Sequence, residues 1–377
     1  MKLDLKTFLP KLALVKKVIN PKPVITVQGC FLLRSKDGML YVNASDTENT
    51  VSVGVKPLEY SEMNICVNAN DFYSALLNLR GEEIELTLNP EKKLVRCAYK
   101  SGFFQLPYTD DENSSAVLEI QPSDYVIDKD IDDTFTLSEA IMKAEIATSE
   151  DNLKPILCGV HFDFRQDGMV VVACDSRKLS KYKTNITFDT DRKGFVMPKK
   201  GANILTSLMS EYESDTVNMK ASDNRVLFTG EAYTLSVILT EGDFPSYDAL
   251  IPTDNVFCAT VKRNALLNAV QRVAPMESDK DEMLLINFDK NAMIVEAEDV
   301  FLKKKAKEKV SCLYDGEPMR IGMKSDNVIT LLQALDSDDV EVHFKTPNTA
   351  IVILPLSEMK ERLLTLCMPM IISYYNK

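Results

Sequence analysis

Residues 29–46 read GCFLLRSKDGMLYVNASD: two apolar runs flank an Asp-Gly pair, and an aspartate ends the second run. The pattern predicts a β-hairpin, because Asp-Gly readily adopts the positive φ angles that two-residue hairpin turns require. A similar pattern recurs at 159–175, GVHFDFRQDGMVVVACD, and a shorter form at 285–299, LINFDKNAMIVEAED. The Asp-Gly pairs that begin at 37 and 167 are 130 residues apart. The chain therefore contains an internal repeat.

A second block repeats at nearly the same spacing. It reads NICVNANDFYSALLNL at 64–79, GFVMPKKGANILTSLM at 194–209 and MRIGMKSDNVITLLQAL at 319–335. Repeats this long far exceed those of solenoids, so each copy should be a whole domain with its own core. The Pro-containing joints at 121–124 and 251–254 predict domains at 1–122, 123–252 and 253–377. Three equivalent domains suggest a ring or an arc.

Each third of the chain can be divided into helix, paired strands, helix and paired strands. The predicted helices cover 7–18, 68–79, 137–149, 198–210, 262–276 and 324–335. We expect Thr7 and Thr136 to be N-caps, which would place Pro10 in a first turn. The predicted fold class is α+β, with three repeated domains that each pack two helices on antiparallel sheets.

Composition is typical of a folded intracellular protein. The 377 residues are 45% hydrophobic and 27% charged, with a net charge of −12. The eight cysteines are scattered singly, which favours reduced core residues in a cytoplasmic protein. We find neither a signal-peptide pattern nor 18 consecutive apolar residues, so no membrane partner is expected.

Positive charge is concentrated on the predicted helices. These six segments sum to +6 in a chain of −12. If they share one side of the molecule, that side would attract phosphate. No aromatic stripe accompanies the basic residues, so contact should be independent of base sequence. The alternative is that they form ordinary solvated helix faces; they are Lys11, Lys16, Lys17, Lys199, Lys200, Lys262, Arg263 and Arg272.

A catalytic constellation is not recognisable. The chain has two histidines, His161 and His343, and both lie in strand patterns. Nucleotide-binding, serine-hydrolase and zinc-protease motifs are missing. We therefore expect no catalytic residues, no cofactor and no metal. A hydrolase or nuclease accessory that uses Asp46, Asp175 and Asp299 is an alternative, but turn geometry explains those strand-end acids more simply.

Two further stretches carry a family resemblance. Residues 233–252, YTLSVILTEGDFPSYDALIP, and 366–370, LCMPM, resemble the bacterial DNA polymerase III β subunit, the replicative sliding clamp. The resemblance extends over the whole chain, through 1–3 (MKL), 196–201 (VMPKKG) and 321–322 (IG). It implies a non-enzymatic processivity factor of DNA replication, which encircles double-stranded DNA as a head-to-tail homodimer at the nucleoid. Lys22, Lys199 and Lys200 occupy positions where the family has DNA-contacting basic residues.

The family also implies a peptide-binding groove between the second and third domains. This groove would receive short linear peptides of the polymerase III α subunit, the clamp loader and repair polymerases. Flexible methionines and fixed prolines suit an adaptable apolar slot. The corresponding residues are Leu157, Cys174, Asp175, Ser176, Arg177, Lys178, Leu179, Pro245, Leu250, Asn327, Met368, Pro369 and Met370.

The chain departs from the family at the expected subunit interface. Residues 301–309, FLKKKAKEK, replace a strand that is often acidic, and Asp71 lies where a basic helix is usual. We hypothesise a charge-swapped interface formed by Asp71, Phe103, Met276, Lys303, Lys304 and Lys305. The alternative is a lysine-rich edge strand that resists aggregation. Residues 371–377 extend past the family's usual end.

The alternative function is a clamp-like protein scaffold that has lost DNA encirclement.

Overall fold

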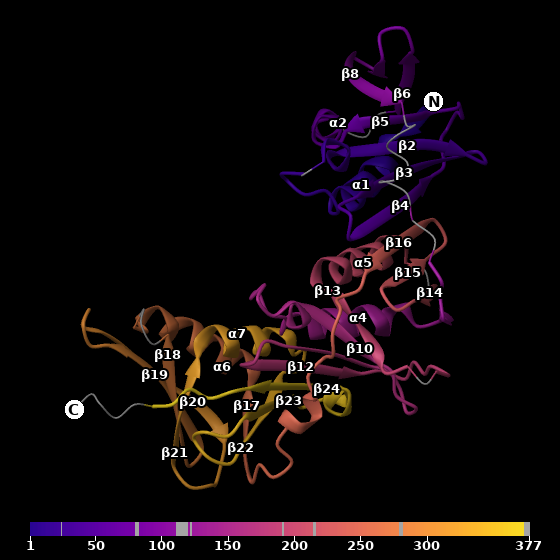
Figure 1. Ribbon diagram of the computed structural model, residues 1–377. Helices are drawn as coiled ribbons and strands as arrows, with labels where there is room; N and C mark the ends of the chain where they lie inside the picture. The colour runs from indigo at the N-terminus through magenta and orange to yellow at the C-terminus, as the bar shows by residue number, and fades with distance from the viewer. Residues whose placement is uncertain are drawn as a thin grey trace. The chain divides into compact units, whose positions relative to one another are not determined.

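A computed structural model describes residues 1–23, 25–79, 83–110, 120, 123–190, 192–213, 216–278 and 282–372 (Figure 1). The chain divides into two compact units. Unit 1 holds Met1–Ser138 and Lys200–Thr240, and unit 2 holds Glu139–Lys199 and Glu241–Lys377. Each unit is built around one twelve-stranded antiparallel arrangement.

The three predicted hairpins are present. They are β2 (Cys30–Lys36) with β3 (Met39–Ser45), β10 (Gly159–Asp163) with β11 (Val170–Cys174), and β18 (Met283–Asp289) with β19 (Ala292–Asp299). Asp-Gly forms a two-residue turn only in the first, because residues 164–169 connect the two strands of the second. In the first turn Asp37 and Gly38 have φ angles of 51° and 79°, as a two-residue turn requires. Asn291, at a φ of 56°, serves the third turn.

The second repeated block is a strand that runs directly into a helix. The three copies are β5 (Asn64–Asn68) with α2 (Ala69–Leu77), β13 (Gly194–Pro198) with α5 (Lys199–Tyr212), and β21 (Met319–Lys324) with α7 (Ser325–Ala334). The other helix of each repeat precedes its hairpin: α1 (Leu5–Lys16), α4 (Thr134–Glu145) and α6 (Arg263–Val273). The predicted fold class is therefore correct. No described helix has the length and apolar character needed to cross a membrane.

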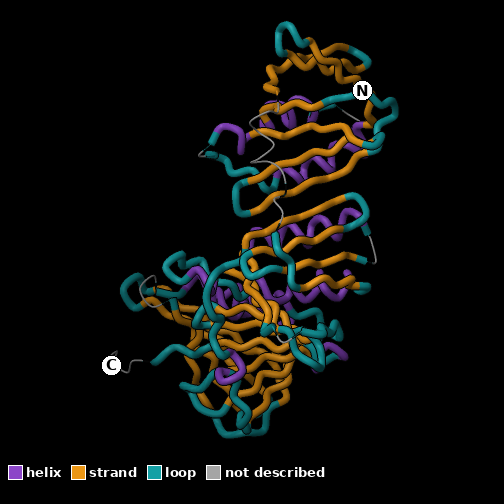
Figure 2. Tube along the Cα trace, turned by 45° about the vertical axis from the view of Figure 1, so that its right-hand side comes forward, coloured by secondary structure: helices purple, strands orange, loops and turns teal. Residues whose placement is uncertain are grey.

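In unit 1 the strand order is β1-β6-β7-β8-β5-β2-β3-β4-β16-β15-β14-β9. Helix α1 packs against β3, β4 and α2, and the strands run in front of the helices in the turned view (Figure 2). The first and second repeats join where Val53 of β4 faces Tyr233 of β16. The remaining strands are β1 (Lys2–Asp4), β4 (Asn49–Val55), β6 (Glu83–Asn89), β7 (Leu94–Tyr99), β8 (Gly102–Asp110), β9 (Ile127–Ile131), β14 (Val217–Ala221), β15 (Arg225–Thr229) and β16 (Tyr233–Ile238).

In unit 2 the strand order is β13-β10-β11-β12-β24-β23-β22-β17-β20-β19-β18-β21. Its remaining strands are β12 (Lys178–Lys183), β17 (Phe257–Lys262), β20 (Lys304–Leu313), β22 (Asp339–Phe344), β23 (Ile351–Pro355) and β24 (Leu363–Cys367). The central repeat thus contributes strands to both units. The domain limits after 122 and 252 stay predictions, and residues 121 and 122 lie outside the described residues.

Two helices begin earlier than predicted, each at an aspartate. Asp4 is the N-cap of α1, where its side chain accepts from the backbone N–H of Lys6, so Pro10 lies inside the helix. Asp133 accepts from the N–H of Thr136 at the start of α4 (2.9 Å). The predictions of Thr7 and Thr136 as N-caps are therefore wrong. Asp and Thr both cap helices, and here the earlier residue of the two takes the position.

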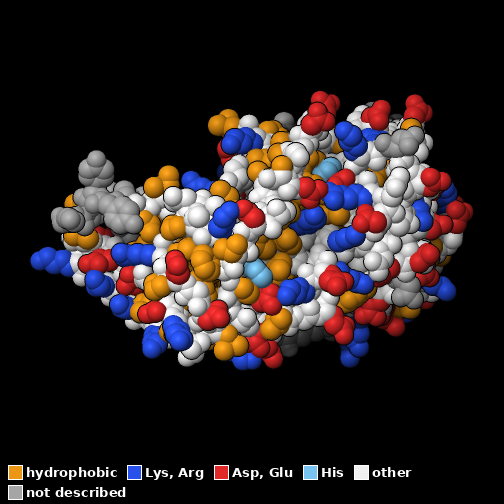
Figure 3. Space-filling model, turned by 90° about the horizontal axis from the view of Figure 1, so that it is seen from below, with side chains coloured by type: hydrophobic (Ala, Val, Ile, Leu, Met, Phe, Trp, Pro, Cys, Tyr) orange, Lys and Arg blue, Asp and Glu red, His pale blue; other side chains and the backbone are white. Residues whose placement is uncertain are grey.

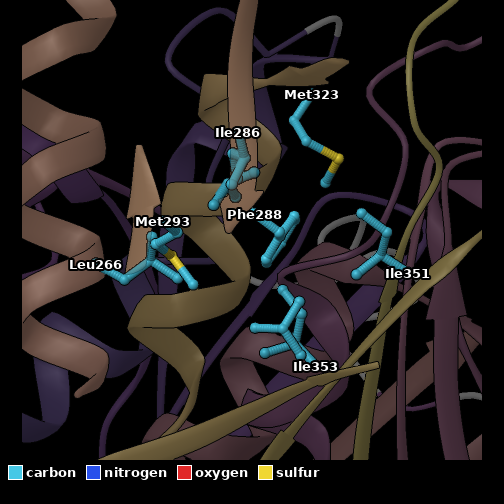
Figure 4. A pocket seen from close by; sticks show the side chains of 9 residues that line it. Leu266, Ile286, Phe288, Met293, Met323, Ile351 and Ile353 are labelled. Carbon is cyan, nitrogen blue, oxygen red and sulfur yellow. The ribbon is translucent and has the colours of Figure 1, made fainter. Parts of the chain in front are cut away.

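The core of the third repeat closes around a small apolar void. Leu266, Ile286, Phe288, Met293 and Met323 point toward it, together with Ile351 and Ile353 from the neighbouring strand (Figure 4). Its volume is about 10 Å³ and its lining is apolar, so it is a packing defect of the core without room for a ligand.

The cysteines are all free thiols, and five of them are buried. The prediction that they are core residues fails for Cys258, which is exposed on β17. Cys30 and Cys158 are half-buried.

Candidate functional site

Three of the predicted DNA-binding lysines lie on α1 or directly after it. Lys11 and Lys16 lie over the rings of Tyr212 and Tyr73, with the ammonium 5.1 and 4.5 Å from the ring centroids. Lys17 is exposed and donates to the hydroxyl of Ser207 on α5 (2.7 Å). These contacts leave the three charges without a neutralising carboxylate among the interactions of the described residues. They remain available to an anion.

Lys200 occupies a different environment, at the first turn of α5. Its Nζ donates to Asp46 Oδ2 (2.6 Å), Asn20 Oδ1 (2.7 Å) and the carbonyl of Val18 (2.6 Å). The carboxylate of Asp46 is only 4% exposed. The ammonium therefore satisfies a buried acid, which makes Lys200 a structural tie within unit 1. Lys22 is exposed, and Lys199 is half-buried.

The basic residues of β17 and α6 are paired within unit 2. Lys262 forms an ion pair with Asp339 (2.7 Å), and Arg272 forms a bidentate pair with Glu308. Arg263 donates to the carbonyls of Leu332 and Ser337 at the end of α7. The positive charge of these residues is thus largely neutralised or engaged locally.

Three of the predicted groove residues, Leu157, Cys174 and Leu179, belong to a buried apolar cluster of unit 2. Its buried members are Leu157, Val170, Val172, Cys174, Leu179, Tyr247, Ala350, Val352 and Leu366. Burial raises the pKa of the Cys174 thiol to about 11, so this part of the floor is uncharged at neutral pH. Leu250 and Met368 are 51% and 40% exposed, and Pro245 is exposed. Leu250 directly precedes Ile251, which packs against the cluster, and Met368 follows the cluster member Leu366 by two residues. Asn327 is buried on α7. Figure 3 shows hydrophobic side chains reaching the surface in patches among mixed charges.

A tight turn that contains predicted groove residues connects β11 to β12. Asp175 Oδ1 accepts from the backbone N–H groups of Arg177 and Lys178, and its other oxygen pairs with Lys178 Nζ. Ser176 has a φ of 73°, a left-handed conformation that favours glycine. The side chain of Arg177 is exposed.

Two backbone hydrogen bonds hold the segment Met368–Met370. The N–H of Met368 donates to the carbonyl of Arg177 (2.7 Å), and that of Met370 donates to the carbonyl of Gly322 (2.8 Å). A Cβ on Gly322 would lie 2.9 Å from the Met370 carbonyl oxygen. The glycine therefore lets this segment lie flat against the edge of β21.

A polar network that the sequence did not reveal fixes the loop carrying Leu250. Arg165 donates to Asp163 (2.8 Å) and to Asp248 (2.5 Å), and Lys181 donates to Asp248 (2.8 Å). The hydroxyl of Tyr247 donates to Asp163 (2.6 Å). Tyr247 and Asp248 begin a 3₁₀ turn, Tyr247–Leu250, so the network holds the backbone that carries Leu250. The bonds that link Arg165, Lys181 and Asp163 to the loop join residues 67 to 84 apart in the chain, and no local motif marks them.

The predicted interface residues lie beside two partly unpaired strands, one in each unit. The stretch Gly102–Pro107 of β8 pairs with β7, and only residues 108–110 pair with β5. In β20, Lys304–Ser311 pairs with β19, and the register with β17 is limited to 312 and 313. Within the part of the chain that the structure describes, both strands therefore have a stretch that pairs with a neighbouring strand on one side only.

The side chains around these edges are placed as follows. Phe103 is 54% exposed, Lys303 is exposed, and Met276 and Lys304 are half-buried. Lys305 pairs with Glu298 (2.7 Å). Asp71 is exposed in the first turn of α2, where its charge favours the helix dipole.

The three strand-end aspartates have a structural role. Asp46 accepts from the N–H groups of Glu48 and Asn49, Asp175 caps its turn as described, and Asp299 accepts from the N–H of Leu302. These bonds account for the recurrence of the acids in all three repeats. They do not gather the carboxylates into a catalytic group.

Comparison with known proteins identifies the class. Three models of the DNA polymerase III beta subunit match: the N-terminal domain at 1–114, the central domain at 133–246 and the C-terminal domain at 248–371. A beta sliding clamp of Treponema pallidum is 24% identical over 360 residues, covering 92% of this chain and 93% of its own. One of Synechocystis is 22% identical over 93% and 94% of the two chains.

Solved structures agree on the fold. The sliding clamp of Bartonella birtlesii, crystallised with griselimycin, superposes with a TM-score of 0.90 at 20% identity, with 99% of both chains covered. The polymerase III β subunit of Thermotoga maritima gives 0.89 at 20% identity and the same coverage. The fold is that of the three-domain processivity clamps of DNA replication. The chain belongs to the DNA polymerase III β subunit family, the bacterial sliding clamps.

Proposed function

We propose that two copies of this chain assemble head to tail into a closed ring around double-stranded DNA. The ring confers processivity on the replicative polymerase in the cytoplasm, at the nucleoid, and catalyses no reaction itself. The observation that carries the proposal is the succession of three clamp domains, each with two helices, in a chain whose β8 and β20 both have open edges. Lys11, Lys16, Lys17, Lys22 and Lys199 supply the phosphate-facing charge.

The proposed groove would bind the partner proteins of the ring. Leu157, Cys174–Leu179, Pro245, Leu250, Asn327 and Met368–Met370 would receive short peptides of the polymerase III α subunit, the clamp loader and repair polymerases. The buried apolar cluster supports this role because Leu157, Cys174 and Leu179 belong to it, and the exposed Leu250 precedes Ile251, which packs against it. An apolar peptide side chain that covered these residues would remove their surfaces from water.

The test is retention on nicked circular DNA after treatment with a clamp loader. We expect the protein to remain on the circle in high salt and to leave when the circle is cut, because a ring is held topologically. Retention on the linear product would contradict encirclement. Loss of retention with intact peptide binding would favour the scaffold that has lost DNA encirclement.

The peptide function is measured separately with a fluorescent clamp-binding peptide of the host polymerase III α subunit. Leu250→Asp should weaken peptide binding by about 10- to 100-fold, because a charge would replace an apolar contact at the rim. Leu356→Asp, at a leucine of similar exposure (46% against 51%), is the matched control. Both variants should still be retained on the circle.

Subunit pairing should depend on the proposed charge swap. We expect Asp71→Lys to weaken the dimer about fivefold to tenfold, because it would place like charges opposite Lys303 and Lys304. Adding Lys303→Glu should restore part of the loss. Sedimentation equilibrium at low salt measures both, with the exposed Asp124→Lys as control. If Asp71→Lys left the dimer unchanged, the charge swap would be wrong. Lys303 and Lys304 would then serve only to protect an edge strand from aggregation.

A further inference from the structure

Three side chains with metal-ligating atoms converge on the outer face of β17 and β22. Cys258 lies directly opposite His343 in the antiparallel register, and Glu341 is two residues before His343 on the same face. Cys258 Sγ is 3.8 Å from His343 Nε2, and Glu341 Oε2 is 2.8 Å from the same nitrogen. All three potential ligand atoms lie within 4.8 Å of one another.

The geometry does not suit a thiol nucleophile. In a Cys-His-carboxylate triad the thiol and the carboxylate contact opposite nitrogens of the imidazole, so that the ring is oriented by one and takes a proton from the other. Here both contact Nε2. Burial, and then the charge of Glu341, raise the pKa of the Cys258 thiol, whereas reactive cysteines have a lowered pKa. The site therefore lacks both features of an activated cysteine.

Convergence on one point is the arrangement that a metal ion requires. Usual zinc bond lengths give tetrahedral separations of about 3.6 Å between sulfur and nitrogen and about 3.3 Å between nitrogen and oxygen. The present 3.8 and 2.8 Å differ from these by a few tenths of an ångström. Small side-chain rotations would accommodate the change, since the side chain of His343 is 27% exposed and that of Glu341 14%.

We propose that Cys258, Glu341 and His343 bind one Zn²⁺ ion, with water as the fourth ligand. A thiolate, an imidazole and a carboxylate are a donor set that zinc accepts, and magnesium or calcium would not select the sulfur. Lys360 competes for the site, because its Nζ lies 2.7 Å from Glu341 Oε2.

The proposed metal site lies on the same sheet face as part of the apolar cluster of the proposed groove. Val352 on β23 is the register partner of His343, and it belongs to the buried apolar cluster under the groove. Directly opposed residues of an antiparallel pair share one face of the sheet. The metal would therefore cross-link β17 and β22 beside the strand that helps to form the groove floor.

The experiment uses the full-length untagged protein, reduced and freed of metal, titrated with Zn²⁺ and separately with Co²⁺. We expect one Zn²⁺ per chain and release of about one proton, which the Cys258 thiol must lose to ligate. Bound Co²⁺ should show a sulfur-to-metal charge-transfer band and the strong visible bands of four-coordinate cobalt. Cys258→Ser should abolish the charge-transfer band and weaken Zn²⁺ binding by at least about 100-fold.

Matched variants make the result specific. Cys158→Ser, at another partly exposed cysteine of unit 2, should leave binding unchanged. Lys360→Gln should tighten binding, because it frees Glu341 and removes a nearby positive charge. His343→Gln repeats the test without touching the thiol. Equal affinity in the Cys258→Ser and Cys158→Ser proteins, or cobalt bound without a thiolate band, would overturn the proposal.

Discussion

Lys200→Met should destabilise unit 1 by about 2 to 3 kcal/mol, a large loss for one surface-accessible lysine. The variant removes the ammonium that satisfies Asp46 Oδ2 and leaves that oxygen with only the side-chain amide of Asn49 (3.2 Å). The carboxylate cannot turn to water, because it is 4% exposed. We expect a loss of stability near the lower end of this range, because the side chain of Lys200 is 35% exposed and water can partly replace its ammonium in the variant.

The measurement is hydrogen exchange of unit 1 amides together with calorimetry, since a chain of two units need not unfold in one step. Lys199→Met, at the adjacent residue, should change stability by less than about 0.5 kcal/mol. The double variant Asp46→Asn, Lys200→Met should recover part of the loss, because it removes the unpaired charge.

The salt dependence of DNA binding separates the structural role of Lys200 from DNA contact. Lys17→Met should lower the dependence of duplex binding on log salt by about one ion, as expected for a lost phosphate contact. Lys200→Met should leave that slope unchanged, because its ammonium already has three protein acceptors. A reduced slope without loss of stability would show that Lys200 leaves Asp46 to meet phosphate.

Local patterns in the sequence predicted the elements that form from local interactions. The Asp37-Gly38 turn and the three strand-to-helix blocks depend on residues that are neighbours in the chain, so spacing alone found them. The first residue of a helix is harder to predict from sequence. Asp4 and Thr7 are both good N-caps, and only the structure shows that Asp4 accepts the capping hydrogen bond.

Interactions between distant residues could not be predicted in this way. The charge of Arg272 is cancelled by Glu308, 36 residues away, and Arg263 binds carbonyls at least 69 residues away. Counting charges along helices therefore overstated the free positive charge. Cys258 and His343 are 85 residues apart, and only the register of β17 with β22 brings them together. No local spacing motif in the sequence therefore marks this cluster of side chains.

Gly194→Ala should have the largest effect of any single methyl group added to unit 2. Gly194 has a φ of 121°, and a Cβ there would lie 1.8 Å from the carbonyl oxygen of Phe162 on β10. Neither side can give way, because Asp163 faces Gly194 directly in the pairing of β10 with β13. We expect a loss of about 4 kcal/mol or more, with the pairing of these strands disrupted.

Gly242→Ala is the matched control, because it separates the clash from the backbone strain. Its φ of 114° is nearly the same, but the nearest atom to a new Cβ is Ile156 Cδ1 at 3.8 Å. The strain alone should cost about 1 to 3 kcal/mol. Hydrogen exchange should show β10 and β13 opening in Gly194→Ala and remaining protected in Gly242→Ala. Equal protection of these strands in both variants would contradict the prediction, because it would mean that the sheet accommodates the added methyl group. Since β10 begins two residues after Leu157 of the proposed groove, Gly194→Ala should also weaken peptide binding.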